Sequence, residues 1–201
     1  MPDRIIDCCS LLNLYAGWGG LDNLQQIEHS WFICKAVEGE SQITREYDEH
    51  QQPQDRELTL QPFVQSGVIQ VIAPETDEEI ESYLEFAEFV DDGEAQAIAL
   101  AKHRGLTLLT DDRKALKLAQ NAGIETVSTV DILREWIERG GIQIADVRKT
   151  LTRIRELARF APPKNSPTSS GGSPSSPSHN TISSNRPVKT LPGSVLTNSR
   201  P

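Results

Sequence analysis

The stretch GEAQAIALAKHRGLTLLTDDRKA, residues 93–115, is the most informative part of the sequence for the fold. It contains Ala95–Ala101, a segment that is almost wholly apolar and rich in alanine, which predicts a buried helix. Leu106–Leu109 follows as an apolar run of strand length, and 113–122 has the pattern of a further helix, which Gly123 ends. A helix, a strand and a helix in succession are typical of an α/β protein.

The same alternation continues on both sides of this stretch. Short apolar runs predict strands at residues 4–9, 31–34, 67–73 and 124–127. The spacing of apolar residues predicts helices at residues 11–16, 21–27, 37–47, 129–139 and 144–160. Because strands that alternate with helices usually pair in parallel, the sequence predicts an α/β fold with a central parallel sheet.

A further helix is predicted to begin after Thr76. Thr76 and Glu79 have the spacing of a capping box, in which each side chain bonds the backbone N–H of the other residue. The predicted apolar face of this helix consists of Ile80, Tyr83, Leu84, Ala87 and Val90. We expect that face to be buried.

The last predicted helix has a basic surface. Its cationic side chains are Arg148, Lys149, Arg153, Arg155 and Arg159. They form either an ordinary solvated surface or a track that binds the phosphates of RNA.

Residues 161–201 differ in composition from the rest of the chain. They contain 8 of the 12 prolines and 11 serines, and they contain no acidic residue and no Phe, Trp or Tyr. Such a segment cannot bury enough apolar surface to offset the conformational entropy that ordering costs. The sequence therefore predicts a folded domain at residues 1–160 and a disordered tail at residues 161–201.

The net charge of −9 is unevenly distributed. Residues 1–143 carry 27 acidic and 11 basic side chains, whereas residues 144–201 carry 2 acidic and 9 basic ones. An acidic balance argues against a protein that coats DNA or a membrane surface. It permits an enzyme that acts on nucleic acid with a metal ion, because carboxylates are ligands of hard cations.

We expect no membrane span, since no run of about 18 apolar residues occurs. We also expect no signal peptide, since only a short apolar stretch follows the N-terminal Met-Pro-Asp-Arg. The cysteines are Cys8, Cys9 and Cys34, and an odd number with two adjacent members is a poor basis for disulfide bonds. All three lie in strand-like apolar runs, so we predict that they are small buried hydrophobic residues. We expect a cytoplasmic protein.

Polar residues at the carboxyl ends of strands are candidates for a site, because open α/β sheets bind their ligands at that edge. Asp7 lies in the apolar run at residues 4–9, where a carboxylate must be paired, solvated in a cleft or bound to a metal. The alternative is that Asp7 caps the next helix. Ser10 is better placed for that cap, so we interpret Asp7 as functional.

Asp111 and Asp112 follow the strand at residues 106–109. Two adjacent carboxylates at such a position are typical of a divalent-metal site. The alternative is that Asp111 caps the next helix and Asp112 lies in its first turn. We expect at least one of the two to be a metal ligand. Arg113 and Lys114, next to them, either contact phosphate or are solvated.

Two glutamates complete the set of candidates. Glu94 opens the buried helix on the same face as its apolar residues, so it points inward or into the rim of a cleft. Alternatively, it forms a capping box with Asp91. Glu40 follows the second strand and, taken alone, has the pattern of a solvated residue in a first helical turn; Glu38 is its closest rival.

Taken in order, these motifs resemble the PIN-domain family, in its prokaryotic branch related to VapC-like toxins. A strand ending in Asp7, followed by Leu11-Leu12-Asn13-Leu14, is similar to the start of a PIN domain. Three later segments are similar, in order, to the second half of a PIN domain. They are residues 93–101, Leu109-Thr110-Asp111-Asp112-Arg113-Lys114-Ala115 and Val127-Ser128-Thr129. The resemblance covers about residues 3–158.

The resemblance implies a three-layer α/β/α sandwich and a ribonuclease whose acidic cluster binds Mg²⁺ or Mn²⁺. It implies as catalytic residues Asp7, Glu40, Glu94 and Asp112, and as metal ligands Asp7, Glu94, Asp111 and Asp112. Two positions depart from the family or match it weakly. The third acidic position is often Asp in the wider family and is Glu94 here, and the match of Glu40 rests only on Val37-x-x-Glu40.

The resemblance also implies partners. They are an RNA substrate, an antitoxin protein if the chain is the toxin of a type II toxin–antitoxin pair, and a second copy in a homodimer. The sequence leaves open a catalytically inactive PIN-like module that binds RNA or protein. Two other enzyme classes do not fit. A haloacid-dehalogenase phosphatase needs Asp-x-Asp after the first strand, where position 9 is Cys, and Gly17-Trp18-Gly19-Gly20 is not a dinucleotide-binding fingerprint.

Overall fold

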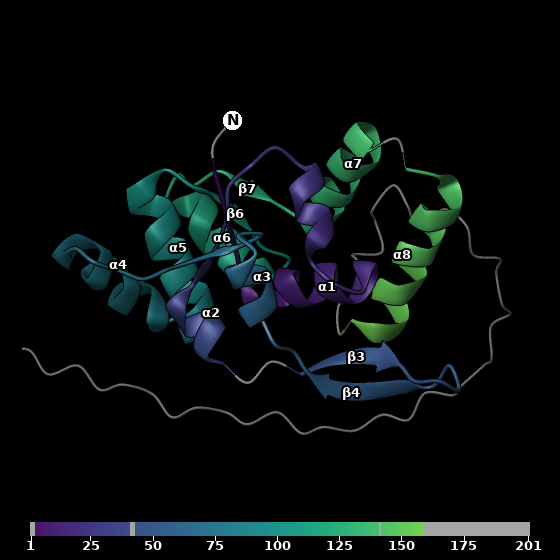
Figure 1. The fold of residues 1–201 in the computed structure, drawn as a ribbon. Coiled ribbons are helices and arrows are strands. Elements are labelled where there is room, and N and C mark those ends of the chain that lie inside the picture. Colours follow the sequence, from purple (N-terminus) through teal and green to yellow (C-terminus); the bar gives the residue numbers. More distant parts are fainter. Residues whose placement is uncertain (1–2, 41–42, 141, 159–201) are drawn as a thin grey trace, which may run out of the picture. The chain divides into compact units, whose positions relative to one another are not determined.

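The computed structural model describes residues 3–40, 43–140 and 142–158 (Figure 1). They form a mixed α/β fold around a five-stranded parallel sheet with the strand order β5-β2-β1-β6-β7. These strands are β1 (Arg4–Ile6), β2 (Trp31–Cys34), β5 (Gln70–Ile72), β6 (Thr107–Leu109) and β7 (Thr126–Val127). The predicted α/β fold with a central parallel sheet is confirmed. The predicted domain boundary at residue 160 lies outside the described residues.

Helices flank the sheet. They are α1 (Cys8–Trp18), the 3₁₀ helix η1 (Asp22–Gln26), α2 (Lys35–Gly39), α3 (Gln61–Gln65), α4 (Asp77–Ala87), α5 (Asp92–Arg104), α6 (Arg113–Asn121), α7 (Thr129–Gly140) and α8 (Ile144–Leu157). Helix α5 packs against α2, α4 and α6, whereas α1 packs against α7 and α8 (Figure 1). Among the described helices, none has the length and hydropathy needed to span a bilayer.

The register of the central strands brings several strand ends together. Ile6 of β1 pairs with Ile33 of β2 on one side and with Leu109 of β6 on the other, and all three side chains are fully buried. The backbone N–H of Asp7 continues this pairing by donating to the carbonyl of Leu109 (3.1 Å). The residues that follow these strands therefore meet at one edge of the sheet, which is called the carboxyl edge below.

The prediction of a helix at residues 37–47 is wrong for the second half of that range. Helix α2 ends at Gly39, and Ile43–Tyr47 forms strand β3, which pairs antiparallel with β4 (Pro53–Glu57) in a separate hairpin. The β-branched and aromatic residues of β3 favour a strand. Tertiary contacts support it, since β3 packs against α1 and α8, and the Tyr15 hydroxyl donates to Glu46 (2.9 Å).

The first predicted strand is also shorter than expected. Strand β1 ends at Ile6 and helix α1 begins at Cys8, so Cys8 and Cys9 are helical rather than extended. Cys34 is buried as predicted, but Cys8 is only partly buried and Cys9 is exposed. All three thiols are free, in agreement with the expectation of no disulfide bond.

Helix α4 begins as predicted, but its predicted apolar face is only partly buried. Tyr83, Ala87 and Val90 of that face pack against the core. Thr76 and Glu79 form the reciprocal bonds of the capping box. The inward side chains are those of Glu79, Ser82 and Phe86, whereas Ile80 and Leu84 of the predicted apolar face are 42% and 59% exposed. The cause is a buried ion pair between helices.

This ion pair joins Glu79 of α4 to Arg104 of α5. The Arg104 Nε donates to Glu79 Oε1 (2.7 Å), and one terminal nitrogen donates both to Glu79 Oε2 (3.0 Å) and to the carbonyl of Ala73 (2.8 Å). The side chain of Glu79 is 5% exposed and that of Arg104 is 27% exposed. A two-point pair of this kind has a defined geometry, so it favours one rotation of α4 about its axis.

We expect acid to weaken the fold through Glu79. Hydrogen bonds from Arg104 hold the pKa of Glu79 at about 2, below its ordinary value of 4.5. A lowered carboxyl pKa stabilises the fold above the unfolded value, and that contribution is lost as the pH falls through about 2. In urea unfolding, the wild type should lose more stability than Glu79→Gln between about pH 6 and about pH 3. The exposed Glu85→Gln variant should follow the wild type; equal acid sensitivity of wild type and Glu79→Gln would contradict this account.

Helices α1 and α8 approach each other closely at Gly17. A Cβ at this position would lie 2.7 Å from Cγ1 of Ile154 and 3.2 Å from Cγ2 of Thr150. Because Ile154 and Thr150 are both buried, neither side chain has room to move away. The packing of α8 on α1 therefore requires the absence of a side chain at residue 17.

The Gly17→Ala variant should accordingly be less stable than the wild type, although alanine is the better helix former. We expect a net loss of about 1–2 kcal/mol, because overpacking outweighs the gain in helix propensity. The control is Gly39→Ala, where a Cβ would meet no atom within 4 Å. Chemical denaturation of both variants measures the difference, and a Gly17→Ala protein as stable as Gly39→Ala would show that the contact is not tight.

Candidate active site

Asp7 lies at the carboxyl edge, directly after β1, and its two oxygens have different surroundings. Oδ1 caps helix α1 by accepting the backbone N–H of Ser10 (2.7 Å). Oδ2 is buried and has no hydrogen-bond partner among the described residues. The expectation that Ser10 supplies this cap is wrong, because α1 begins at Cys8 and places Ser10 in its first turn. Asp7 therefore serves as the cap and still has a free carboxylate oxygen.

Burial raises the pKa of Asp7 to about 6. The Ser10 N–H opposes this shift, as does the nearby Thr110 hydroxyl, which does not have the geometry of a hydrogen bond to Oδ2, whereas the negative charge of Asp111 adds to the shift. A buried carboxylate oxygen without a donor is unusual, since its desolvation is not compensated. A bound cation would supply the missing partner.

Glu94 lies close to Asp7 at the start of α5. Asp91 caps this helix by accepting the backbone N–H of Glu94 (2.9 Å), and the Glu94 side chain faces inward with 8% of the residue exposed. Burial, together with the charges of Asp91, Asp112 and Asp7, raises the pKa of Glu94 to about 7. Because these repulsions act between carboxylates of three separate elements, the elements bring their acidic groups together.

Glu40 reaches the same region from the end of α2. Its Oε1 lies 3.1 Å from the position that a Cβ on Gly93 would occupy, and it accepts a hydrogen bond from the Cys8 thiol. Burial raises the pKa of Glu40, and Asp91 adds to the shift. Its rival Glu38 instead accepts hydrogen bonds from Lys35 and Gln61. The structure therefore places Glu40, not Glu38, beside the start of α5.

Asp112 caps helix α6. Its Oδ1 accepts the backbone N–H groups of Lys114 (2.7 Å) and Ala115 (2.9 Å). The cap is thus one residue later than the alternative considered from the sequence, in which Asp111 had this role. Asp112 is only partly buried, and its charge acts on Glu94. It is therefore available to a ligand at the carboxyl edge.

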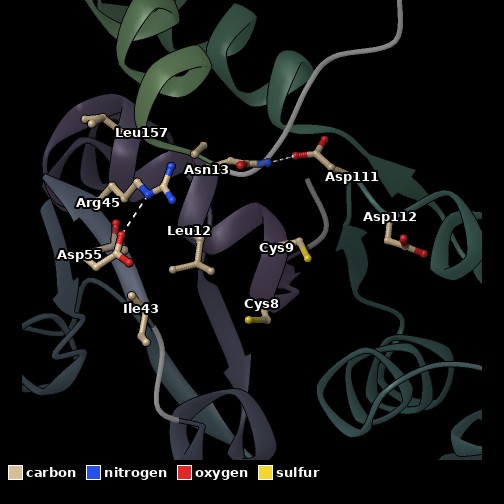
Figure 2. Close-up of a pocket in the computed structure, with 12 residues that line it drawn as sticks. Cys8, Cys9, Leu12, Asn13, Ile43, Arg45, Asp55, Asp111, Asp112 and Leu157 are labelled. Carbon is tan, nitrogen blue, oxygen red and sulfur yellow. Dashed lines mark hydrogen bonds and ion pairs between the residues drawn. The ribbon is translucent and has the colours of Figure 1, made fainter. Parts of the chain in front are cut away.

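Asp111 is held by the protein itself. Its Oδ2 accepts from Asn13 Nδ2 (2.8 Å) (Figure 2). Oδ2 also accepts from the hydroxyl of Thr129, and Oδ1 accepts from the Thr129 N–H (3.0 Å). These bonds connect the loop after β6 to α1 and α7. Because both oxygens already have protein donors, the geometry favours Asp112 over Asp111 as the metal ligand of the pair.

The basic candidates fall into two groups. Arg113 and Lys114 are exposed in the first turn of α6, beside the acidic residues. Arg153 of α8, in contrast, donates to the carbonyl of Ala16 (2.9 Å) and lies over the ring of Tyr47, so it holds α8 in place. Arg159 lies outside the described residues.

A cavity of about 350 Å³ opens beside the acidic residues (Figure 2). Its lining comes from the start of α1, the β3–β4 hairpin, the loop after β6 and the end of α8. Asp111 and Asp112 lie at one side of this cavity, and the ion pair between Arg45 and Asp55 lies at the other (Figure 2). Sequence reasoning did not find this cavity, because the hairpin was not predicted.

The donor chemistry of the carboxyl edge fits a divalent cation. Carboxylate oxygens are the ligands that Mg²⁺ and Mn²⁺ take, and Asp7 Oδ2 is a buried oxygen without a partner. In the part of the chain that the structure describes, no three Asp, Glu, His or Cys side chains are close enough to hold one ion. The residues therefore match an ion in type, and their carboxylates would have to draw closer to bind it.

The comparison with models of known protein families finds a match described as a PIN domain, over residues 3–165. The chain belongs to the PIN-domain family. PIN domains are generally nucleases and typically depend on a divalent metal, so membership supports a nuclease function for this chain. No curated protein matches the chain.

Proposed function

We propose that this PIN domain is an endoribonuclease that hydrolyses RNA phosphodiester bonds with the help of Mg²⁺ or Mn²⁺. The observation that carries the proposal is the buried, unpartnered Oδ2 of Asp7 among carboxylates of α5 and α6. Asp7, Glu40, Glu94 and Asp112 are the residues to which we assign the ion. Asp111 positions the loop that carries Asp112.

A bound divalent ion supplies two things: it neutralises charge on the phosphoryl oxygens and it activates water. The chain itself supplies the position of each group. Asp7 is fixed by its cap on α1, and Asp112 by its cap on α6, so both carboxylates are held before substrate arrives. Arg113 and Lys114, exposed at the same edge, are placed to bind phosphates of the strand.

The proposal is tested by incubating the full chain with labelled single-stranded RNA in Mn²⁺ and, in parallel, in EDTA. We expect internal cleavage in Mn²⁺ and none in EDTA. The same assay with single-stranded DNA tests the assignment of RNA as substrate. The alternative, an inactive module that binds RNA or protein, predicts no cleavage under either condition.

Loss of the exposed cations should weaken substrate binding rather than chemistry. We expect the double variant Arg113→Ala/Lys114→Ala to raise KM by about 3–10-fold with little change in kcat, because each phosphate contact contributes mainly to binding. The effect should shrink as salt concentration rises. Lys117→Ala, exposed on the same helix, is the control and should behave as the wild type. A fall in kcat at unchanged KM would assign these residues to catalysis instead.

We further propose that the ribonuclease is the toxin of a toxin–antitoxin pair, which would make an antitoxin protein its partner and a homodimer its assembly. Support comes from the order of the motifs, which resembles VapC-like toxins. Induced expression of the wild type should arrest bacterial growth, and expression of Asp7→Asn should not. If bacteria that express an active wild-type protein grow normally, the proposed toxin role is wrong, whereas the proposed nuclease activity is unaffected.

A further inference from the structure

The cavity beside the acidic residues has the size of a small-ligand site. Its volume of about 350 Å³ is at the lower end of the range for such sites, about 300–1,000 Å³. Asp111 and Asp112 belong to its lining, so a ligand in the cavity would be continuous with one at the carboxyl edge. The space suits a single nucleotide and is too small for a base-paired duplex.

Part of the cavity lining is apolar. Leu12 of α1, Ile43 of β3 and Leu157 of α8 line it, and Ile43 is 49% exposed although it is a large apolar residue (Figure 2). Covering such a surface with a flat, weakly hydrated ring is favourable. A nucleobase has that character, whereas a phosphate or a metal ion does not.

The hairpin also contributes a polar group to the lining, Arg45, which lies two residues after Ile43 and so on the same face of β3. Arg45 Nε donates to Asp55 Oδ1 (2.9 Å), and the rest of the guanidinium extends from this carboxylate toward α1 (Figure 2). A guanidinium plane can stack on a base, or its terminal N–H groups can donate to the edge of the base. Those donors are useful only if the edge of the base is not already paired.

We propose that the cavity between α1 and the β3–β4 hairpin binds one unpaired nucleobase of the RNA strand, next to the bond that is cleaved, and that Arg45 is its polar contact. This inference rests on the proposed function, because it takes RNA as the substrate. It makes the enzyme selective for single-stranded RNA, since a paired base cannot enter.

The test is binding of a fluorescently labelled RNA oligonucleotide of mixed sequence to the full chain, measured by anisotropy in EDTA. Arg45→Gln and Ile43→Ser should each weaken binding by about tenfold, the size expected for one stacked base. The matched control is Arg56→Gln, which removes the same charge from the outer strand of the same hairpin, where Arg56 faces Glu46 rather than the cavity. It should weaken binding less than about twofold.

The same oligonucleotide annealed to its complement should bind at least about tenfold more weakly than the single strand. Equal binding of both forms, equal effects of Arg45→Gln and Arg56→Gln, or no saturable binding would overturn the proposal. A free nucleoside monophosphate that competes as well as the strand would assign the cavity to a soluble nucleotide and also overturn it. The binding assay is run in EDTA and therefore does not depend on a metal ion. Absence of cleavage in Mn²⁺ would refute the proposed nuclease function but would leave the binding result unchanged.

Discussion

Replacing Asp7 by asparagine should lower the rate of RNA cleavage by about 10²–10³-fold, the usual loss when one electrostatic group is removed from a hydrolytic site. Asparagine keeps the shape of the side chain and the oxygen that accepts the Ser10 N–H, so helix α1 keeps its cap. It removes the negative charge of Oδ2, which we assign to the metal ion. The change should therefore separate catalysis from folding.

Stability measurements check that separation. Burial raises the pKa of Asp7 to about 6, so above that pH its ionised form weakens the metal-free fold. In EDTA at about pH 8, Asp7→Asn should therefore be as stable as the wild type or more so. Mn²⁺ should raise the melting temperature of the wild type and not that of Asp7→Asn.

The control for this variant is Asp3→Asn. Asp3 lies at the other end of β1, where its Oδ1 accepts the N–H of Ser30 (3.2 Å), and its replacement removes the same charge far from the carboxyl edge. It should leave the cleavage rate and the response to Mn²⁺ unchanged. If Asp3→Asn and Asp7→Asn lose activity equally, net charge rather than a bound ion accounts for the loss.

Replacing Asp111 by alanine should have the largest effect on stability, about 3–4 kcal/mol, because it leaves buried donors without acceptors. Asn13 is 2% exposed and Thr129 is 1% exposed, and both donate to this carboxylate. The bonds cross from the loop after β6 to α1 and α7, so their loss loosens three elements together. Urea unfolding measures the change.

Asp112→Ala is the matched variant, one residue away. It removes only the cap of α6, so about 1 kcal/mol of stability should be lost, while cleavage should fall as it does for Asp7→Asn. The Asp111→Ala protein would then lose mainly stability, and the Asp112→Ala protein would lose mainly cleavage activity. The reverse pattern, with a stable and inactive Asp111→Ala protein, would make Asp111 the ligand.

Much of the carboxyl edge could be predicted from the sequence, because parallel strands must end at a common edge. Asp7 in an apolar run, Glu94 before an alanine-rich helix, and Asp111-Asp112 after a buried strand are patterns that depend on neighbours in the chain. The structure brings Asp7, Glu94 and Asp112 close enough for their charges to interact. Their role as metal ligands stays a prediction.

The division of work between Asp111 and Asp112 could not be predicted. It depends on Asn13 and Thr129, which come from helices far apart in the chain and meet Asp111 only in the folded protein. An amide within the apolar run Leu11-Leu12-Asn13-Leu14 was the available signal, since a buried Asn needs partners. Ser10 was likewise taken for a cap because its place in the first turn of α1 depends on where β1 ends.

The hairpin was missed for a different reason. Residues 37–47 have apolar spacing that fits a helix, yet β3 owes its conformation to pairing with β4 and to packing against α1 and α8. Local pattern does not contain such contacts. The exposure of Ile80 and Leu84 on α4 was missed in the same way, because the pair between Glu79 and Arg104 joins elements that are far apart in the chain.

We propose that carboxylates at one edge of the sheet bind a divalent ion that supports hydrolysis of RNA. The most direct test is the cleavage rate of labelled single-stranded RNA as a function of Mn²⁺ concentration, with wild type and Asp7→Asn purified side by side. The account predicts a rate that rises with Mn²⁺ and saturates for the wild type, and that stays near zero for Asp7→Asn. Equal rates for the two proteins, or cleavage by the wild type that persists in EDTA, would contradict it.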